Sequence, residues 1–259
     1  MANNHGDFFW YELMTTDADA AQDFYGPLLG WEFSGHDAPG MDYRTFAKDG
    51  EGVGGVMPLT KEMTDGGARS FWAGYIFVDD VDASATAITQ AGGEVLMPAN
   101  DVPDVGRIAF VKDPAGAPFY IMHPSRTDGE SKAFAKYEPM EGHCAWNELA
   151  TSDQPGAHDF YTALFGWEKA DSMDMGEMGA YDMYKAGDYT LGAIMRKPAE
   201  MPMSLWSYYF RIPDIDKAAA YVKDKGGQVT MGPQEIPGGD HIIVGSDPQG
   251  AIFHLIGKR

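Results

Sequence analysis

Hydrophobic and polar positions follow the same order twice along this chain. A short apolar strand is predicted at 8–14 and again at 144–150, and each is followed by a Thr-Asp or Ser-Asp pair typical of a helix start. The helices that follow carry apolar residues at three- and four-residue spacing and end at Gly30 and Gly166, and Trp31 and Trp167 start the next strands. The two copies lie 136 residues apart, which is too long for a solenoid unit and indicates a duplicated domain.

The remainder of each half predicts more strands and a second helix. In the first half we expect a helix from Asp79 through Gln90 and strands at 43–47, 53–59, 71–78, 107–112 and 117–122. In the second half we expect a helix from Asp214 through Lys225 and strands at 180–186, 190–195, 205–212, 241–245 and 251–256. Each half therefore reads as strand, helix and strands, twice over, which is an α+β pattern.

The length of 259 residues fits two domains of ordinary size. We predict a first domain at 1–124, a polar linker at 125–141 and a second domain at 142–259. The chain has no apolar run long enough to cross a membrane, and we expect no signal peptide. Its single cysteine, Cys144, fits a reducing compartment, so we expect a cytoplasmic protein.

The formal net charge of −20 changes the list of expected partners. Such a charge repels phosphate backbones and anionic membranes, and the chain has no basic stripe to offset it. We therefore expect a small-molecule ligand, no nucleic acid and no membrane. The chain is expected to act either as a monomer with paired domains or as a homodimer.

Four motifs, three of them present unchanged in both halves, resemble those of one known family. They are Glu-Leu-x-Thr-x-Asp, a helix with Asp-Phe-Tyr, then Leu-Phe-Gly-Trp, and finally Asp-Pro-x-Gly-Ala. Together they resemble the vicinal oxygen chelate superfamily, which includes glyoxalase I, extradiol dioxygenases and bleomycin-binding proteins. The resemblance implies a tandem duplication of the glyoxalase-like fold, with four βαβββ modules whose curled mixed sheets form cups. Such motifs specify the fold and leave the reaction open.

The resemblance also implies where metal ligands would stand. In the first half those positions hold Trp10, Ala73 and Tyr120, and in the second half they hold Trp146, Ser207 and His254. A catalytic metal normally needs about three His, Asp or Glu ligands. We therefore expect no cofactor; a divalent metal, if one binds, is expected at His254 and Glu148.

The predicted cup walls carry a carboxylate beside a tryptophan. Trp10 and Glu12 point to one side of their strand, as do Trp146 and Glu148, because strand side chains alternate. The predicted catalytic residues are Glu12 as a base, Tyr120 as a donor to an oxyanion, and Arg107 as an anchor for an anionic group. The predicted substrate-binding residues are Trp10, Tyr75, Phe77, Trp146, Glu148, Tyr209, Arg211 and His254.

Several of these residues also have structural interpretations. Glu12 and Glu148 recur in both halves, which favours a structural role for at least one of them. Arg211 is expected to pair with Glu148, and Arg107 could instead serve an interface between the domains. The second half is rich in methionine, which suits both a core with irregular gaps and a variable ligand. This cluster comprises Met173, Met175, Met178, Met183, Met195, Met201 and Met203.

Three functions follow from these residues and from the resemblance. The first is a metal-independent enzyme of the lyase or isomerase type that acts on a small carbonyl or aromatic metabolite in an aromatic cup. The alternative is a non-catalytic protein that sequesters an aromatic or antibiotic-like ligand. The third is a metal-dependent glyoxalase or dioxygenase that uses the second domain.

Overall fold

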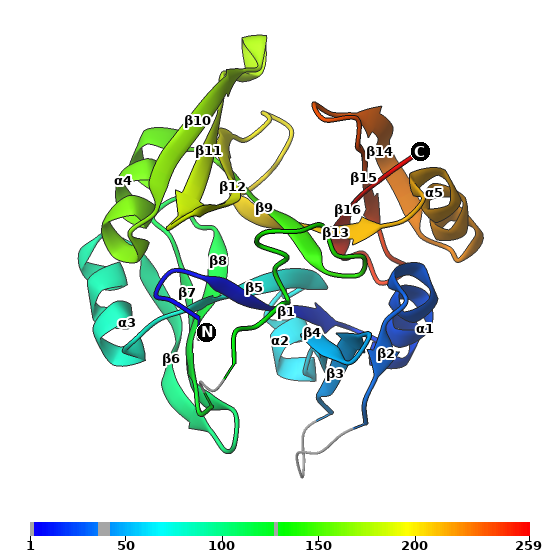
Figure 1. The fold of residues 1–259 in the computed structure, drawn as a ribbon. Helices are drawn as coiled ribbons and strands as arrows, with labels where there is room; N and C mark the ends of the chain where they lie inside the picture. The colour runs from blue at the N-terminus through cyan, green and yellow to red at the C-terminus, as the bar shows by residue number, and fades with distance from the viewer. Residues whose placement is uncertain (1–2, 36–41, 127–128) are drawn as a thin grey trace. The chain divides into compact units, whose positions relative to one another are not determined.

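The computed structural model describes residues 3–35, 42–126 and 129–259. In this part of the chain two eight-stranded sheets share one topology (Figure 1). The first has the order β2-β3-β4-β1-β5-β8-β7-β6 and the second the order β10-β11-β12-β9-β13-β16-β15-β14. This confirms the α+β class and the duplication expected from the sequence.

The first sheet and its helices are built by the first half of the chain. The elements are β1 (Phe8–Thr15), α1 (Ala18–Leu29), β2 (Glu32–Phe33), β3 (Arg44–Lys48), β4 (Glu51–Pro58), α2 (Lys61–Asp65), β5 (Phe71–Phe77), α3 (Val81–Gln90), β6 (Glu94–Val102), β7 (Gly106–Lys112) and β8 (Pro118–Pro124). Apart from the short helix α2, they form two βαβββ modules.

The second half repeats these elements. They are β9 (Cys144–Thr151), α4 (Gln154–Phe165), β10 (Glu168–Asp174), the 3₁₀ turn η1 (Gly176–Met178), β11 (Ala180–Ala186), β12 (Tyr189–Arg196), β13 (Leu205–Ile212), α5 (Ile215–Asp224), β14 (Gln228–Glu235), β15 (His241–Ser246) and β16 (Ile252–Gly257). In both halves the first and last strands of a module pair in parallel, as in β1 with β4 and β13 with β16. The outer strands pair in antiparallel fashion.

The helix boundaries follow the capping chemistry expected from the sequence. The side chains of Asp17 and Asp153 accept the free amides of Ala20 and Gly156 at the starts of α1 and α4. Gly30 and Gly166 end these helices in the left-handed conformation, which costs glycine little because it has no Cβ. Local sequence therefore determines where these two helices begin and end.

Two strands escaped prediction from the sequence. β6 and β14 lie at the outer edges of the two sheets, and most of their side chains are exposed. They lack the apolar alternation of a buried strand, and each contains a proline, Pro98 or Pro233, beside an irregularity in its pairing. Proline is tolerated at an edge or bulge because its missing N–H is not needed by a neighbouring strand.

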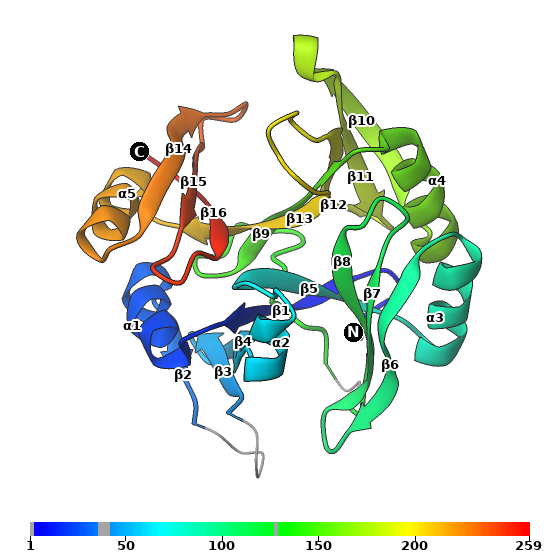
Figure 2. The ribbon, with the colours of Figure 1, turned by 180° about the vertical axis from the view of Figure 1, so that it is seen from behind.

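Contacts divide the chain into two compact units, and each unit contains modules from both halves. Unit 1 comprises Met1–Phe9, Gly74–Ser131 and Trp146–Ser207, and unit 2 comprises Trp10–Ala73, Lys132–Ala145 and Tyr208–Arg259. Within unit 1 α3 lies beside α4, and within unit 2 α1 lies beside α5 (Figures 1 and 2). The domain limits at residues 124 and 142 remain a prediction from the sequence.

Two repeated tryptophans link the halves in both units. In unit 2 the indole N–H of Trp31 donates to the carbonyl of Gly142, with 2.7 Å between the heavy atoms. In unit 1 the indole N–H of Trp167 donates to the carbonyl of Gly6, at 2.9 Å. Each tryptophan thus binds the residue stretch that precedes the first strand of the other half. The Gly-Trp motif therefore serves the association of the halves as well as the fold of each one.

A second reciprocal link uses the Asp-Phe-Tyr and Asp-Pro-x-Gly motifs. The hydroxyl of Tyr161 on α4 donates to Asp113 of the first-half turn, at 3.2 Å, and accepts from the indole of Trp206, at 2.9 Å. Its counterpart Tyr25 on α1 donates to Asp247 at 3.0 Å. All these side chains are buried. Burial raises the pKa of both aspartates, although the tyrosine hydrogen bonds oppose this change.

Among the described residues, no helix is both long and apolar enough to span a membrane.

Candidate functional site

A chain of hydrogen bonds joins three side chains on one side of the second sheet, within unit 1. The indole N–H of Trp146 on β9 donates to the hydroxyl of Tyr181 on β11, at 2.8 Å. That hydroxyl donates to Oε2 of Glu148 on β9, at 2.7 Å. Because one phenol contacts both Trp146 and Glu148, the prediction that these two residues share a side of their strand is confirmed.

The register of three strands explains how the phenol reaches the carboxylate. Glu148 on β9 is opposite Ala193 on β12, and Tyr181 on β11 is opposite Met195 on β12. The tyrosine therefore crosses β12 diagonally, over the small side chain of Ala193. A larger residue at this position would occupy the path of the phenol ring.

The surroundings of Tyr181 keep its proton in place. Burial and the nearby negative charge of Glu148 raise the pKa of Tyr181 far above its ordinary value. The phenol is therefore protonated at neutral pH and acts as a fixed hydrogen-bond donor. Because Tyr181 donates to Oε2 of Glu148, it holds that carboxyl group in a defined position.

The first half contains the corresponding residues in unit 2. The indole N–H of Trp10 donates to the hydroxyl of Tyr43, at 3.0 Å. The hydroxyl end of Tyr43 lies against Gly55, where an added Cβ would clash with it, and Gly55 is the strand neighbour of Glu12. Glu12 is 3% exposed. The same Trp, Tyr and Glu thus recur in both halves, with Gly55 replacing Ala193.

Aromatic side chains cover the neighbouring strands β5 and β8 in unit 1. Tyr75 and Tyr120 are opposite each other in the parallel pair and stack with ring centroids 4.3 Å apart. Phe110 on β7 packs on Tyr120 at 4.4 Å. Phe77, two residues after Tyr75, packs edge-on against Phe9 at 5.9 Å. The structure therefore brings together three residues predicted for the site, Tyr75, Phe77 and Tyr120, on adjacent strands of one sheet.

Their second-half counterparts lie in unit 2. Tyr209 and His254 are opposite each other on β13 and β16, with ring centroids 4.8 Å apart. Burial lowers the pKa of His254 to about 4, because a charged imidazole loses its hydration there. His254 is therefore neutral at physiological pH.

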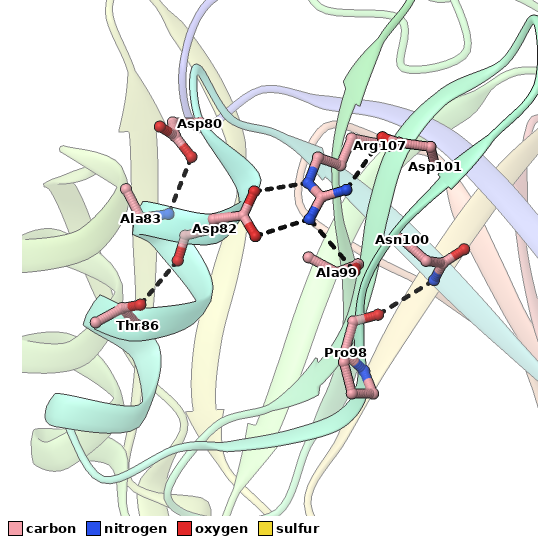
Figure 3. Close-up of polar contacts among 9 residues, drawn as sticks. All are labelled: Asp80, Asp82, Ala83, Thr86, Pro98, Ala99, Asn100, Asp101 and Arg107. Atoms are coloured by element: carbon pink, nitrogen blue, oxygen red, sulfur yellow. Dashed lines mark hydrogen bonds and ion pairs between the residues drawn. The ribbon is translucent and has the colours of Figure 1, made fainter.

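The two predicted arginines are both engaged by aspartates. Arg107 on β7 lies between α3 and β6, where Asp82 accepts two hydrogen bonds at 2.6 and 2.8 Å and Asp101 accepts one at 3.1 Å (Figure 3). Arg211 forms an ion pair with Asp240, at 2.9 Å. An anionic ligand at either arginine would have to compete with these carboxylates. The pairing of Arg211 with Glu148 remains a prediction.

The described residues do not provide the donor set of a metal site. They contain no group of three or more His, Cys, Asp or Glu side chains placed to hold an ion. At the positions implied by the sequence resemblance, Trp10 and Trp146 have no carboxylate or imidazole to offer, and each donates its indole N–H to a tyrosine. Glu148 accepts a phenol hydrogen bond. These residues do not fit a three-ligand metal, so we derive no step that involves one.

Sequence reasoning missed Tyr43 and Tyr181. Neither is among the predicted site residues, because Tyr181 on β11 and Tyr43, directly before β3, lie two strand positions from β9 and β1 in the sheet order. One signal was available: each stands three residues before an aromatic residue, Phe46 or Tyr184, in matching strands of the two halves. That signal does not say that the phenol reaches a carboxylate on another strand.

Comparisons with known proteins identify similar chains. The profile of the family described as Glyoxalase/Bleomycin resistance protein/Dioxygenase superfamily matches residues 8–121 and 142–255. The chain is 36% identical to "Putative glyoxylase CFP32" of Mycobacterium bovis over 95% of this chain and 93% of that protein. It is 31% identical to "Anthracycline biosynthesis protein DnrV" of Streptomyces peucetius over 96% and 92% of the two chains. Among solved structures, the Mn(II)-bound glyoxalase from Novosphingobium aromaticivorans has a TM-score of 0.67 and 18% identity, over 98% of this chain and 82% of that one.

Proposed function

Because the chain belongs to the Glyoxalase/Bleomycin resistance protein/Dioxygenase superfamily, we propose that it is an enzyme that moves a proton on a small carbonyl or aromatic metabolite without a metal. This corresponds to a lyase or isomerase type of reaction. The observation that carries the proposal is the hydrogen bond from Tyr181 to Glu148, with the Trp146 indole behind it.

In the proposed reaction the Glu148 carboxylate removes a proton from the carbon next to a carbonyl group. Tyr181 and Trp146 orient the carboxylate before the substrate arrives, which lowers the cost of reaching the reacting geometry. Glu12, with Tyr43 and Trp10, takes the same role in the first half. Tyr120 remains the proposed donor to the developing oxyanion. Arg107 lies on the side of β7 opposite Phe110 and Tyr120, beside α3, so it remains a prediction from the sequence and takes no part in this step.

Proton exchange tests the proposal without knowledge of the natural substrate. Protein dialysed against a chelator is incubated in D₂O with dihydroxyacetone, 2-hydroxyacetophenone and the hemithioacetal of methylglyoxal and glutathione, and loss of the α-proton signal is followed by NMR. We expect catalysed exchange with at least one probe, and a loss of about 100-fold or more in the double variant Glu12→Gln/Glu148→Gln.

A control substitution makes the result specific. Glu62→Gln changes an exposed glutamate of α2 and is expected to leave the exchange rate unchanged. If no probe exchanges above the background rate, or if the double variant Glu12→Gln/Glu148→Gln exchanges as fast as the unchanged protein, the proposed reaction is wrong. Exchange that depends on added Mn²⁺, Ni²⁺ or Zn²⁺ contradicts its metal-independent form.

The second candidate is a protein that binds an aromatic ligand without changing it. The half-buried methionines beside Tyr181 favour it, because thioether side chains adapt to flat apolar ligands. The similarity to a protein named for anthracycline biosynthesis also supports an aromatic ligand. Quenching of tryptophan fluorescence by a ligand that mass spectrometry recovers unchanged separates this candidate from the enzyme.

A further inference from the structure

Three methionines are close strand neighbours of Tyr181 on one side of the second sheet. Met173 on β10 and Met195 on β12 are the direct strand partners of Tyr181 on β11. Met183, two residues along β11, is opposite Ala193, which is in turn opposite Glu148 on β9. Residues directly opposite each other point to the same side of a sheet. We call this set the methionine face: Met173, Met183, Met195, Tyr181, Ala193 and Glu148.

The opposite side of the same strands forms a buried core. Leu149, Tyr184 and Ile194 alternate with the residues of the methionine face and are at most 1% exposed. By contrast, Met173, Met183 and Met195 are half-buried, so part of each thioether side chain remains accessible. The methionines are therefore on the accessible side of these strands and do not fill the core beneath them.

The chemistry of the methionine face selects a ligand type. Thioethers are polarisable and pack favourably against aromatic rings, and three of them adjoin one phenol here. The distance from β10 to β9 is three strand spacings, or about 14 Å, which is long enough for several fused rings. The Glu148 carboxylate at one end accepts hydrogen bonds and repels anions.

The first half repeats this row only in part. The row that ends at Glu12 contains Gly55 on β4 and Thr45 on β3, in place of Ala193 and Met183, while Met57 on β4 takes the place of Met195. The two halves therefore differ at Met183 in what they offer a ligand beside the carboxylate.

We propose that the methionine face binds a flat, uncharged, fused-ring aromatic compound whose hydroxyl group donates to Glu148. The rings lie on Met173, Met183 and Met195. The inference rests on the proposed function for the location of the site, and it adds the substrate class and assigns that substrate to the second half. It does not depend on turnover.

Binding of 2-hydroxyphenanthrene, followed by its own fluorescence and by calorimetry, tests the proposal. We expect saturable binding that weakens about tenfold in Met183→Ala/Met195→Ala. The matched control Met63→Ala/Met231→Ala removes two methionines that are each 39% exposed and lie in unit 2. It is expected to bind like the unchanged protein. Equal affinity in both double variants, or no saturable binding to the unchanged protein, overturns the proposal.

The hydrogen bond to Glu148 has its own comparison. 2-Methoxyphenanthrene has the same rings but no hydroxyl proton, so we expect it to bind about five- to tenfold more weakly than 2-hydroxyphenanthrene. Glu148→Gln is expected to remove most of this difference. If the two probes bind equally to the unchanged protein, the assigned orientation is wrong.

A measurement on the unchanged protein covers the case of a variant that does not fold. With ¹³C-labelled methionine methyl groups, the probe is expected to shift the NMR signals of Met173, Met183 and Met195 and to leave that of Met63 in place. Shifts confined to other methionines refute the proposal. The phenanthrene probes have no carbonyl group, so failure to bind them is distinct from failure to catalyse proton exchange. If the protein catalyses exchange but does not bind the probes, only the proposed fused-ring substrate class is rejected.

Discussion

Replacing Tyr161 by phenylalanine tests the reciprocal link between the halves in unit 1. The hydroxyl of Tyr161 is the acceptor for Trp206 at 2.9 Å and the donor to Asp113 at 3.2 Å, and all three side chains are at most 2% exposed. The substitution removes only one oxygen atom, so packing of the ring is retained. Its effect therefore reports the hydrogen bonds that this oxygen makes.

The expected loss follows from those two bonds. A hydrogen bond to a charged group contributes about 1.5–3 kcal/mol, and a buried donor left without an acceptor costs about 1–3 kcal/mol. Tyr161→Phe is therefore expected to lower the free energy of unfolding by about 3–5 kcal/mol at neutral pH. Tyr221→Phe is the control, because its hydroxyl donates only to backbone carbonyls of Asp23 and Phe24 at 3.2–3.3 Å near the surface. There we expect a loss of about 1 kcal/mol or less.

The deficit of Tyr161→Phe is also expected to depend on pH. Burial raises the pKa of Asp113 in the folded protein, and the hydrogen bond from Tyr161 opposes that increase. A carboxyl with a raised pKa favours folding at low pH and loses that contribution as the pH rises through its folded pKa. Without Tyr161 the pKa of Asp113 is higher still, so the loss with rising pH is larger. The deficit is therefore expected to be greater at pH 7.5 than at pH 4.5.

Urea unfolding followed by circular dichroism at both pH values measures this deficit. A difference of less than about 1 kcal/mol between Tyr161→Phe and the unchanged protein at pH 7.5 would refute the assignment of a stabilising role to the buried phenol. A deficit that grows toward low pH would contradict the role of Asp113 as its charged acceptor.

Two further substitutions test the Trp, Tyr and Glu side chains of the first half and the buried His254. Gly55→Ala places a Cβ within 2.2 Å of the Tyr43 hydroxyl and is expected to displace that ring. In an Ala193→Gly background, which leaves more room over β12, the substitution is expected to reduce proton exchange by the first half. An unchanged tyrosine position in a crystal structure of Gly55→Ala contradicts this expectation. Because the folded pKa of His254 is about 4, below its ordinary value, stability is present above about pH 6.5 and lost as the pH falls toward 4, by up to about 3 kcal/mol. His254→Gln is expected to flatten that part of the pH profile of unfolding, and an unchanged profile refutes it.

Much of the fold was accessible from local sequence. Asp17 and Gly30 begin and end a helix through bonds to their immediate neighbours, so the same chemistry predicts the same element in the second half. The buried strands were also predicted, because their apolar residues are consecutive in the chain. The edge strands β6 and β14 were not, because their largely exposed side chains lack the apolar alternation that marks a strand in the sequence.

The candidate site was only partly accessible in the same way. Alternation along one strand placed Glu148 beside Trp146, which the structure confirms through their common partner. Tyr181 could not be added, because its contact with Glu148 depends on the register of three strands and on the small side chain of Ala193 between them. Sequence likewise named Arg107 but not its position between Asp82 and Asp101.

The sequence by itself determined the duplication and the helix ends. It also determined that three metal-binding side chains are absent from the positions that the family resemblance implies. Each of these results follows from residue identity or short-range chemistry. Only the tertiary structure decided what the repeated motifs do. Tyr161 and Asp113 belong to different halves, and so do Trp31 and Gly142, and contacts between them exist only once distant segments have packed. Side-chain contacts at long sequence separation have no local signal, which is why a repeat that looks like two separate domains is held together by its most recognisable residues.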